Sequence, residues 1–90
     1  MKGADEPRDV RLRRLRLRAW RRGIREMDLI LGGHADRHLG AMDDGALAVF
    51  EAVLGEADHD LLDWVTGRRP APARYADLID ALARGAAVPR

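Results

Sequence analysis

The fold is decided at residues 21–28, Arg21-Arg22-Gly23-Ile24-Arg25-Glu26-Met27-Asp28, where two segments of opposite character meet. A strongly basic segment precedes this stretch, and an acidic segment with helical apolar periodicity follows it. A glycine inside a helical pattern costs roughly 1 kcal/mol relative to alanine, so Gly23 indicates a turn or a partner that approaches closely. Arg22 and Glu26 are four residues apart, which predicts that they share one helical face, where they could form an intrahelical pair.

Charge is distributed unevenly along the chain. Residues 1–26 carry ten basic and four acidic residues, and residues 27–90 carry six basic and eleven acidic residues, so the balances are +6 and −5 around a net charge of +1. Such asymmetry is typical of a basic arm that meets an acidic partner, a nucleic acid or a membrane surface. No apolar run approaches the roughly 20 residues that span a bilayer, and Asp5, Glu6 and Asp9 are untypical of a mitochondrial transit peptide. We therefore expect a cytoplasmic protein without membrane insertion.

Apolar residues recur at helical spacing throughout, and no period-two alternation predicts a strand. Helices are predicted over 8–21 and 24–39, from the cap Asp43 to before Gly55, from the cap Asp58 to Gly67, and over 75–84 before Gly85. The core-facing positions are Leu12, Leu15, Ala19, Ile24, Met27, Leu31, Ala35, Leu47, Phe50, Leu54, Leu61, Trp64, Val65, Tyr75, Leu78, Ile79 and Leu82. The sequence predicts one all-α domain over residues 1–90, a small five-helix bundle with short loops, ordered from about 8 to 85. The pair Gly32-Gly33 is expected to weaken or kink the second helix.

The composition argues against catalysis by this chain alone. It has no cysteine, which excludes disulfides, thiolate nucleophiles and cysteine-based zinc sites, and it has no serine. A chain of 90 residues buries only about 60–65% of its surface, which leaves no room for a deep active site. We expect no catalytic residue and no enzyme activity.

Three histidines and a group of acids are the candidates for a metal site. His34 and His38 are four residues apart and Asp36 lies between them, but no glutamate follows His34 as in a zinc-protease helix. His59 lies at a helix start, where acids such as Asp58 and Asp60 complement the helix dipole. No metal ligand is predicted, and the roles of His34, His38 and His59 stay open.

The arginine row of the first helix favours a second class of function. Clustered cations neutralise phosphates without base contacts, so a basic helical nucleic-acid-binding module is the alternative. Only Trp20 is available for base stacking, and the rest of the chain is acidic, so a solvated arginine face is equally compatible with the sequence. The row comprises Arg11, Arg13, Arg14, Arg16 and Arg18.

Two blocks resemble a known family. Arg22-Gly23-Ile24-Arg25-Glu26 resembles the RGxxE signature of the SdhE-type flavinylation factors, and residues 58–64, Asp-His-Asp-Leu-Leu-Asp-Trp, resemble the family's D-P-D-L-x-x-W segment. The resemblance covers roughly residues 10–83. His59 stands where the family usually has proline, and Gly32-Gly33 replaces bulkier residues.

The resemblance implies an assembly factor without enzyme activity. Such a factor binds the flavoprotein subunit of succinate dehydrogenase and promotes covalent attachment of FAD by a histidine of that subunit. FAD is then attached to the client and is not bound stably by the factor, and nucleic acid is not a partner. The resemblance leaves open whether the fumarate reductase flavoprotein is also a client, whether free FAD is bound, and which oligomeric state the chain adopts. The partner-binding residues it implies are Arg21, Arg22, Gly23, Arg25, Glu26 and Asp28.

Overall fold

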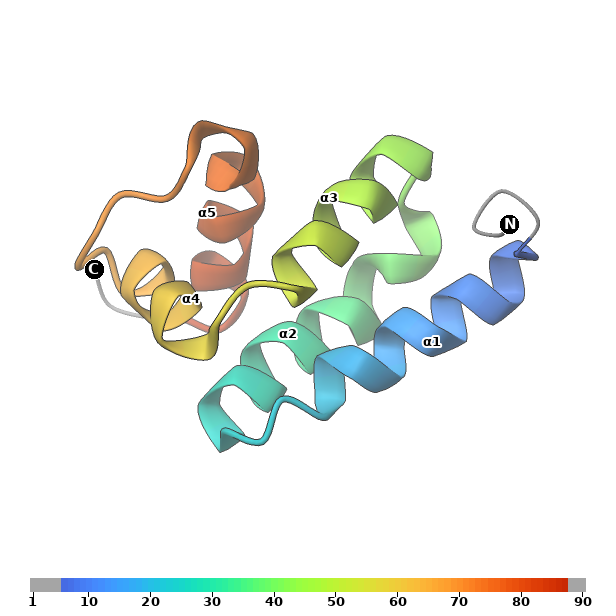
Figure 1. Cartoon of the computed structure of the whole chain (residues 1–90), viewed down its shortest axis with the longest axis horizontal. Coiled ribbons are helices and arrows are strands. Elements are labelled where there is room, and N and C mark those ends of the chain that lie inside the picture. The colour runs from blue at the N-terminus through green and yellow to red at the C-terminus, as the bar shows by residue number, and fades with distance from the viewer. Residues whose placement is uncertain (1–5, 88–90) are drawn as a thin grey trace.

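The computed structural model describes residues 6–87, which form five α-helices and two short 3-10 turns, with no strand in this range (Figure 1). The α-helices are α1 (Arg8–Trp20), α2 (Arg25–His38), α3 (Asp44–Leu54), α4 (Asp58–Val65) and α5 (Ala76–Gly85), and the 3-10 turns are η2 (Leu39–Ala41) and η3 (Ala73–Tyr75). The prediction of an all-α bundle of five helices is confirmed. The predicted loose ends fall mainly on residues 1–5 and 88–90, which lie outside the described range.

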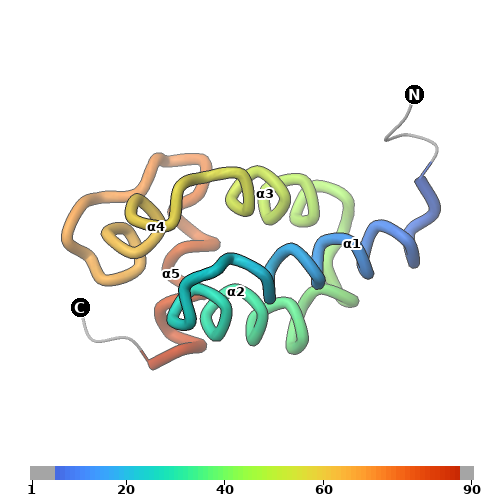
Figure 2. The backbone as a smooth tube through the Cα atoms, turned by 60° about the horizontal axis from the view of Figure 1, so that its bottom comes forward, coloured from blue at the N-terminus to red at the C-terminus, as the bar shows by residue number. Residues whose placement is uncertain are grey.

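The first two helices form an antiparallel pair. Figures 1 and 2 show α1 and α2 side by side along their lengths, joined by the short turn at residues 21–24. α3 contacts α1, and α5 packs against α2 and α4. The α1–α2 turn therefore lies at one end of the hairpin, at the surface of the molecule.

α2 is helical through Gly32-Gly33, and the expected weakening or kink at these glycines stays a prediction. The ring of Trp20 lies directly over Gly32, and a Cβ added there would lie 2.2 Å from Trp20 Cδ2. The indole Nε1 donates a hydrogen bond to Asp36 Oδ1 at 3.3 Å, one turn further along α2. Gly32 thus leaves room for the Trp20 ring to lie against the backbone of α2.

We expect Gly32→Ala to lower the free energy of unfolding by about 1–3 kcal/mol, because the new methyl group must displace the Trp20 ring. Alanine's better helix propensity offsets part of this cost. Urea and thermal unfolding followed by circular dichroism measure the effect.

The neighbouring glycine supplies the control for this prediction. At Gly33 the nearest atom to an added Cβ is the flexible end of Arg37, at 3.3 Å. Gly33→Ala should therefore be neutral or stabilise the domain by up to about 1 kcal/mol. Equal effects of the two substitutions would show that Trp20 leaves Gly32 at little cost.

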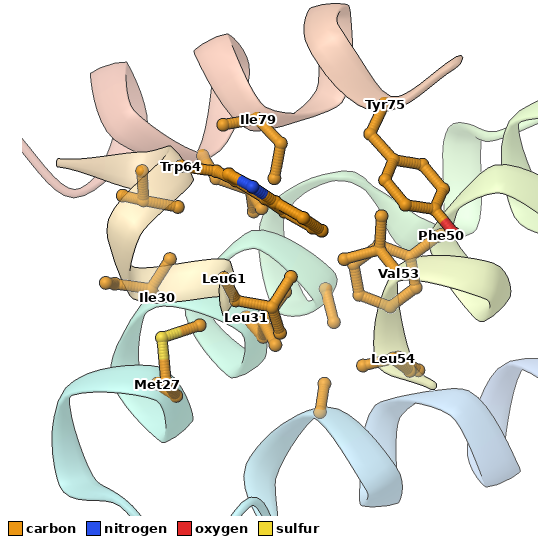
Figure 3. Packing of buried hydrophobic residues seen from close by; sticks show 14 of the residues in the cluster. Met27, Ile30, Leu31, Phe50, Val53, Leu54, Leu61, Trp64, Tyr75 and Ile79 are labelled. Atoms are coloured by element: carbon orange, nitrogen blue, oxygen red, sulfur yellow. The ribbon is translucent and has the colours of Figure 1, made fainter. Parts of the chain in front are cut away.

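A single cluster of apolar side chains from all five helices forms the core (Figure 3). The buried residues on predicted faces are Leu15, Ala19, Met27, Leu31, Ala35, Leu47, Phe50, Leu54, Leu61, Trp64, Val65, Tyr75, Ile79 and Leu82. Leu12 and Leu78 are partly buried against this cluster. Ile24 was predicted to face the core but is 40% exposed, because α2 begins only at Arg25.

The two predicted helix caps have different outcomes. The Asp43 carboxylate accepts a hydrogen bond from the Ala46 N–H at 2.8 Å, so this cap is confirmed. The predicted cap at Asp58 is wrong, since Ala57 occupies the cap position and Asp58 is the first residue of α4. The Asp58 carboxylate instead binds an arginine from the α1–α2 turn.

Candidate functional site

The turn at residues 21–24 is built around a backbone conformation that favours glycine. α1 ends where the Arg21 N–H bonds to the Arg18 carbonyl at 3.3 Å, and Gly23 then adopts a φ of +92°. L-residues with a side chain rarely adopt this φ, whereas glycine does so at little cost. The surrounding space is open, because within the described part of the chain no heavy atom beyond the two neighbouring residues lies within 4 Å of a Cβ placed on Gly23. Backbone geometry therefore accounts for this glycine within the chain itself.

Arg22 turns inward from this turn and binds the segment between α3 and α4. Its Nε donates to Asp58 Oδ1 at 2.9 Å, its Nη2 donates to the Glu56 carbonyl at 2.7 Å, and its Nη1 donates to the Leu54 carbonyl. The Arg22 side chain is only 12% exposed. The interpretation that Arg22 and Glu26 share a helical face is wrong, because Arg22 precedes α2 and its ion pair is with Asp58.

Asp28 closes the turn from the other side. Its Oδ1 accepts a hydrogen bond from the Arg22 N–H at 2.6 Å. Arg22 and Asp28, both predicted to bind a partner, are thus engaged within the chain. The two sequence blocks at 21–28 and 58–64 meet in space through the Arg22–Asp58 pair, which links residues 36 positions apart.

The other predicted partner-binding residues are exposed. Arg21, Gly23, Arg25 and Glu26 lie at the surface of the turn and the first turn of α2. Neither Arg25 nor Glu26 forms an ion pair with any residue of the described range 6–87. Of the six predicted partner-binding residues, four are therefore exposed at the surface. The other two, Arg22 and Asp28, form hydrogen bonds within the chain that hold the backbone of the turn.

Sequence reasoning missed the apolar part of this surface. Leu17 is 50% exposed, Ile24 is 40% exposed and Leu29 is 53% exposed, all close in sequence to the turn. Leu29 lies off the apolar stripe that runs through Met27 and Leu31, and this offset is the signal that could have identified it. Exposed apolar side chains beside charged ones are typical of a surface that binds another protein.

A shallow groove of about 280 Å³ runs along α1 to the turn and is lined by Arg14, Leu17, Arg18, Arg21 and Arg22.

Acids already neutralise part of the arginine row. Arg14 binds both carboxylate oxygens of Glu6 at 2.9 Å and Glu51 at 2.9 Å, and it holds the pKa of both carboxyl groups below the usual value. Arg11 and Arg16 lie 3.5 and 3.4 Å from Glu51 and Asp36.

The histidines lie in different surroundings. His34 is 5% exposed and stacks on Phe50 with ring centroids 6.0 Å apart, and its Nδ1 has no hydrogen-bond partner among residues 6–87. His38 and His59 are exposed, and His59 Nε2 lies 3.5 Å from Asp60. Among residues 6–87 no group of three or more histidine or acidic side chains is arranged to hold a metal ion.

His34 makes the stability of the fold sensitive to acid. Burial, together with the nearby charges of His38 and Arg37, lowers its pKa from 6.5 to about 4. Because the unfolded chain binds the proton more tightly, stability is full above pH 6.5 and falls as the pH drops towards 4, by about 2–4 kcal/mol in total. Urea unfolding at a series of pH values should show this slope.

Substitution of each histidine isolates its contribution to this slope. His34→Leu should remove most of the slope between pH 6.5 and 4.5, whereas His38→Gln should keep most of it, because burial is the largest cause of the lowered His34 pKa and the charge of His38 contributes less. A slope that persists in His34→Leu would assign the acid sensitivity to other groups.

A family model described as flavinator of succinate dehydrogenase matches residues 13–86. A protein of Mycosarcoma maydis named succinate dehydrogenase assembly factor 2, mitochondrial, is 38% identical over 72 residues, which cover 80% of this chain and 30% of that protein. A protein of the same name in Schizosaccharomyces japonicus is 42% identical over 62 residues, which cover 69% of this chain and 43% of that protein. Another of the same name in Saccharomyces cerevisiae is 34% identical over 80 residues, which cover 86% of this chain and 49% of that protein.

The chain spans about a third to a half of the length of these relatives. Their names place them in mitochondria, so the cytoplasmic location expected for this chain stays a prediction. None of the helices in residues 6–87 is long and apolar enough to cross a bilayer.

Proposed function

The chain belongs to the family of flavinators of succinate dehydrogenase, and from this premise we propose that it is an assembly factor for that enzyme. It binds the flavoprotein subunit and promotes the covalent attachment of FAD to it. FAD is bound by the client and not held stably by this chain, which acts without catalysis of its own. We keep the cytoplasm as the proposed location.

The observation that carries this proposal is the rigid, exposed turn between α1 and α2. Gly23 and Glu26 are exposed on it, while Arg22 and Asp28 fix its backbone from beneath. A surface held in one conformation loses little conformational entropy when it binds, which favours specific recognition of a partner. The residues that resemble the RGxxE signature lie in this turn and in the first turn of α2, so the motif coincides with an exposed feature whose backbone is held by hydrogen bonds.

The proposed action is positioning. An assembly factor without a nucleophile promotes a reaction of its client only by favouring a reactive conformation, and it does so through its higher affinity for that conformation. Correct orientation of reacting groups is worth up to about 7–11 kcal/mol of barrier. The exposure of Arg21, Gly23, Arg25 and Glu26 is consistent with a protein partner of large surface.

The alternative of a nucleic-acid-binding module has less support in this geometry. Phosphate binding needs several free cations, yet the guanidinium groups of Arg11, Arg14 and Arg16 are already paired with acids of the same chain. Neutralised arginines release fewer counterions on binding, so they contribute little to affinity for a phosphate backbone.

Reconstitution tests the proposal directly. The purified flavoprotein subunit without its cofactor is incubated with FAD, with and without this chain, and covalent flavin is measured by fluorescence after denaturing electrophoresis. We expect faster covalent attachment with the chain and a complex of the two proteins on gel filtration. Equal attachment with and without the chain, and no complex, would refute the proposal. The fumarate reductase flavoprotein is tested in the same way as a second client.

Gly23→Asn separates the two reasons for a glycine at the turn. Asparagine tolerates positive φ better than other residues with a side chain, so the domain should fold with a loss of about 1 kcal/mol. If the client backbone approaches Gly23 closely, flavinylation should still fall by about tenfold, because the new side chain holds the partner away. Circular dichroism and the covalent flavin assay, made on the same preparation, measure the two effects. Full flavinylation would assign Gly23 to backbone geometry alone.

A further inference from the structure

Within residues 6–87, one guanidinium group of the groove along α1 has no ion pair and a second has only a long one. Of its four arginines, Arg14 is held by Glu6 and Glu51, and Arg22 is held by Asp58. Arg21 forms no ion pair with any residue described between 6 and 87. Arg18 lies 4.0 Å from Glu51, which is already bonded to Arg14 at 2.9 Å. Positive charge is therefore concentrated at the end of the groove nearest the turn.

The same end of the groove is also apolar. Leu17 lines it and is 50% exposed, although it is a large aliphatic side chain on a helix that buries Leu15 and Ala19 completely. Leu17, Arg18 and Arg21 all line this groove, at the last turn of α1 and the residue after it. A ligand for this site must cover an apolar side chain and neutralise two cations.

The hydrogen bonds of the neighbouring Arg22 indicate the kind of ligand that arginines at this turn bind. From the other side of the same turn, it binds a carboxylate and two main-chain carbonyl groups of an acidic segment of this chain, residues 54–58. A free phosphate would neutralise the arginines but leave Leu17 exposed. A polypeptide segment that combines carboxylates with an apolar side chain satisfies both requirements.

We infer that the end of the groove formed by Leu17, Arg18 and Arg21 binds an acidic, leucine-containing segment of a partner polypeptide. The groove is continuous with the exposed turn through Arg21, so the segment belongs to the client and the inference rests on the proposed function in this respect. Carboxylates of the segment pair with Arg18 and Arg21, and an apolar side chain covers Leu17. The contact extends the turn into a larger interface that runs along α1.

The first test uses a probe peptide in place of the client. A fluorescein-labelled synthetic peptide with glutamates on both sides of a leucine is titrated with the whole chain and followed by fluorescence anisotropy. Arg18→Ala with Arg21→Ala should weaken its binding on the order of tenfold, the effect of about 1.4 kcal/mol. The control Arg13→Ala with Arg84→Ala makes the same change in net charge at exposed positions outside the groove, and it should change the affinity by less than about twofold. Circular dichroism confirms that both variants are folded.

Each further arm of the test supports or overturns the inference. Replacing the leucine of the peptide by glycine should weaken binding, because Leu17 loses its contact. Equal weakening by the two double variants would overturn the inference, because it would show a general charge effect. Inorganic phosphate or a single-stranded oligonucleotide that displaces the peptide at equal concentration would also overturn it, in favour of a simple anion site or of nucleic-acid binding.

The client protein is tested last and separately. If the groove is part of the client interface, the flavoprotein subunit should displace the peptide, and the Arg18→Ala, Arg21→Ala variant should bind the subunit on the order of tenfold more weakly. Peptide binding that the subunit does not displace would refute the client as the occupant while leaving the groove as a peptide site. Failure of the proposed function would appear differently, as unchanged covalent flavin in the reconstitution with the unmodified chain.

Discussion

Trp64→Ala is expected to remove about 3–5 kcal/mol of the free energy of unfolding, which is most of the stability of a domain of this size. Trp64 is 7% exposed and joins α4 to the rest of the core, with its ring centroid 5.8 Å from that of Tyr75 (Figure 3). α4 has only eight residues, so its helical hydrogen bonds alone do not hold it in place. Loss of the ring should therefore detach α4 from α5 as well as leaving a cavity.

Trp20→Ala is the matched control, because it deletes the same side chain at a position that is 36% exposed. Its cost should be clearly smaller than that of Trp64→Ala, since less apolar surface returns to water on unfolding. Thermal and urea unfolding of both variants measure the difference. A midpoint for Trp64→Ala equal to that of the unmodified chain would place Trp64 at the surface and contradict the packing described above.

The helices and their inner faces could be predicted from the sequence because periodicity determines them locally. Stripes such as Leu47, Phe50 and Leu54 have the spacing of one helical face, and a bundle buries such faces whatever their order in space. Asp43 was predictable as a cap for the same reason, since its acceptor bond to Ala46 involves only neighbours in the chain.

Contacts between distant segments could not be predicted in this way. Asp58 has the residue type and the position of a cap, yet a stronger charged partner, Arg22, lies 36 residues away and takes its carboxylate. Helix propensity likewise does not reveal the ring of Trp20 that lies over Gly32. Both contacts join segments that are distant in the sequence.

At the candidate site, too, features set by neighbouring residues could be predicted from the sequence, whereas contacts between distant segments could not. Gly23 was identifiable as a turn from its place between two helical patterns, and its φ of +92° agrees with that expectation. The burial of Arg22 was not identifiable, because the sequence does not show that the segment after α3 lies beside the turn. The resemblance named both residues but assigned them one role, whereas the geometry gives Arg22 a structural role within the chain.

Glu26→Ala is expected to lower covalent flavinylation of the client by about tenfold or more while leaving the factor fully folded. Glu26 is exposed in the first turn of α2, and no hydrogen bond or ion pair from its side chain to residues 6–87 is formed. Its removal therefore takes nothing from the fold except a small favourable interaction with the helix dipole, which alanine's helix propensity largely offsets. A hydrogen bond from the client to this carboxylate is worth about 1.5–3 kcal/mol, which corresponds to at least tenfold in affinity.

Arg22→Ala, unlike Glu26→Ala, should also destabilise the fold. The contrast tests whether Arg22 holds the turn while Glu26 contacts the client. Its loss leaves the Asp58 carboxylate and the carbonyl groups of Leu54 and Glu56 without their donor, so stability should fall by about 2–4 kcal/mol together with flavinylation. Arg22→Lys should recover only part of this stability, because an ammonium group cannot donate in three fixed directions from one plane.

Circular dichroism, urea unfolding and covalent flavin fluorescence are measured on all three variants, Glu26→Ala, Arg22→Ala and Arg22→Lys. Full flavinylation with Glu26→Ala would remove Glu26 from the interface, and an unchanged unfolding midpoint for Arg22→Ala would show that the turn does not depend on its bonds to the segment after α3.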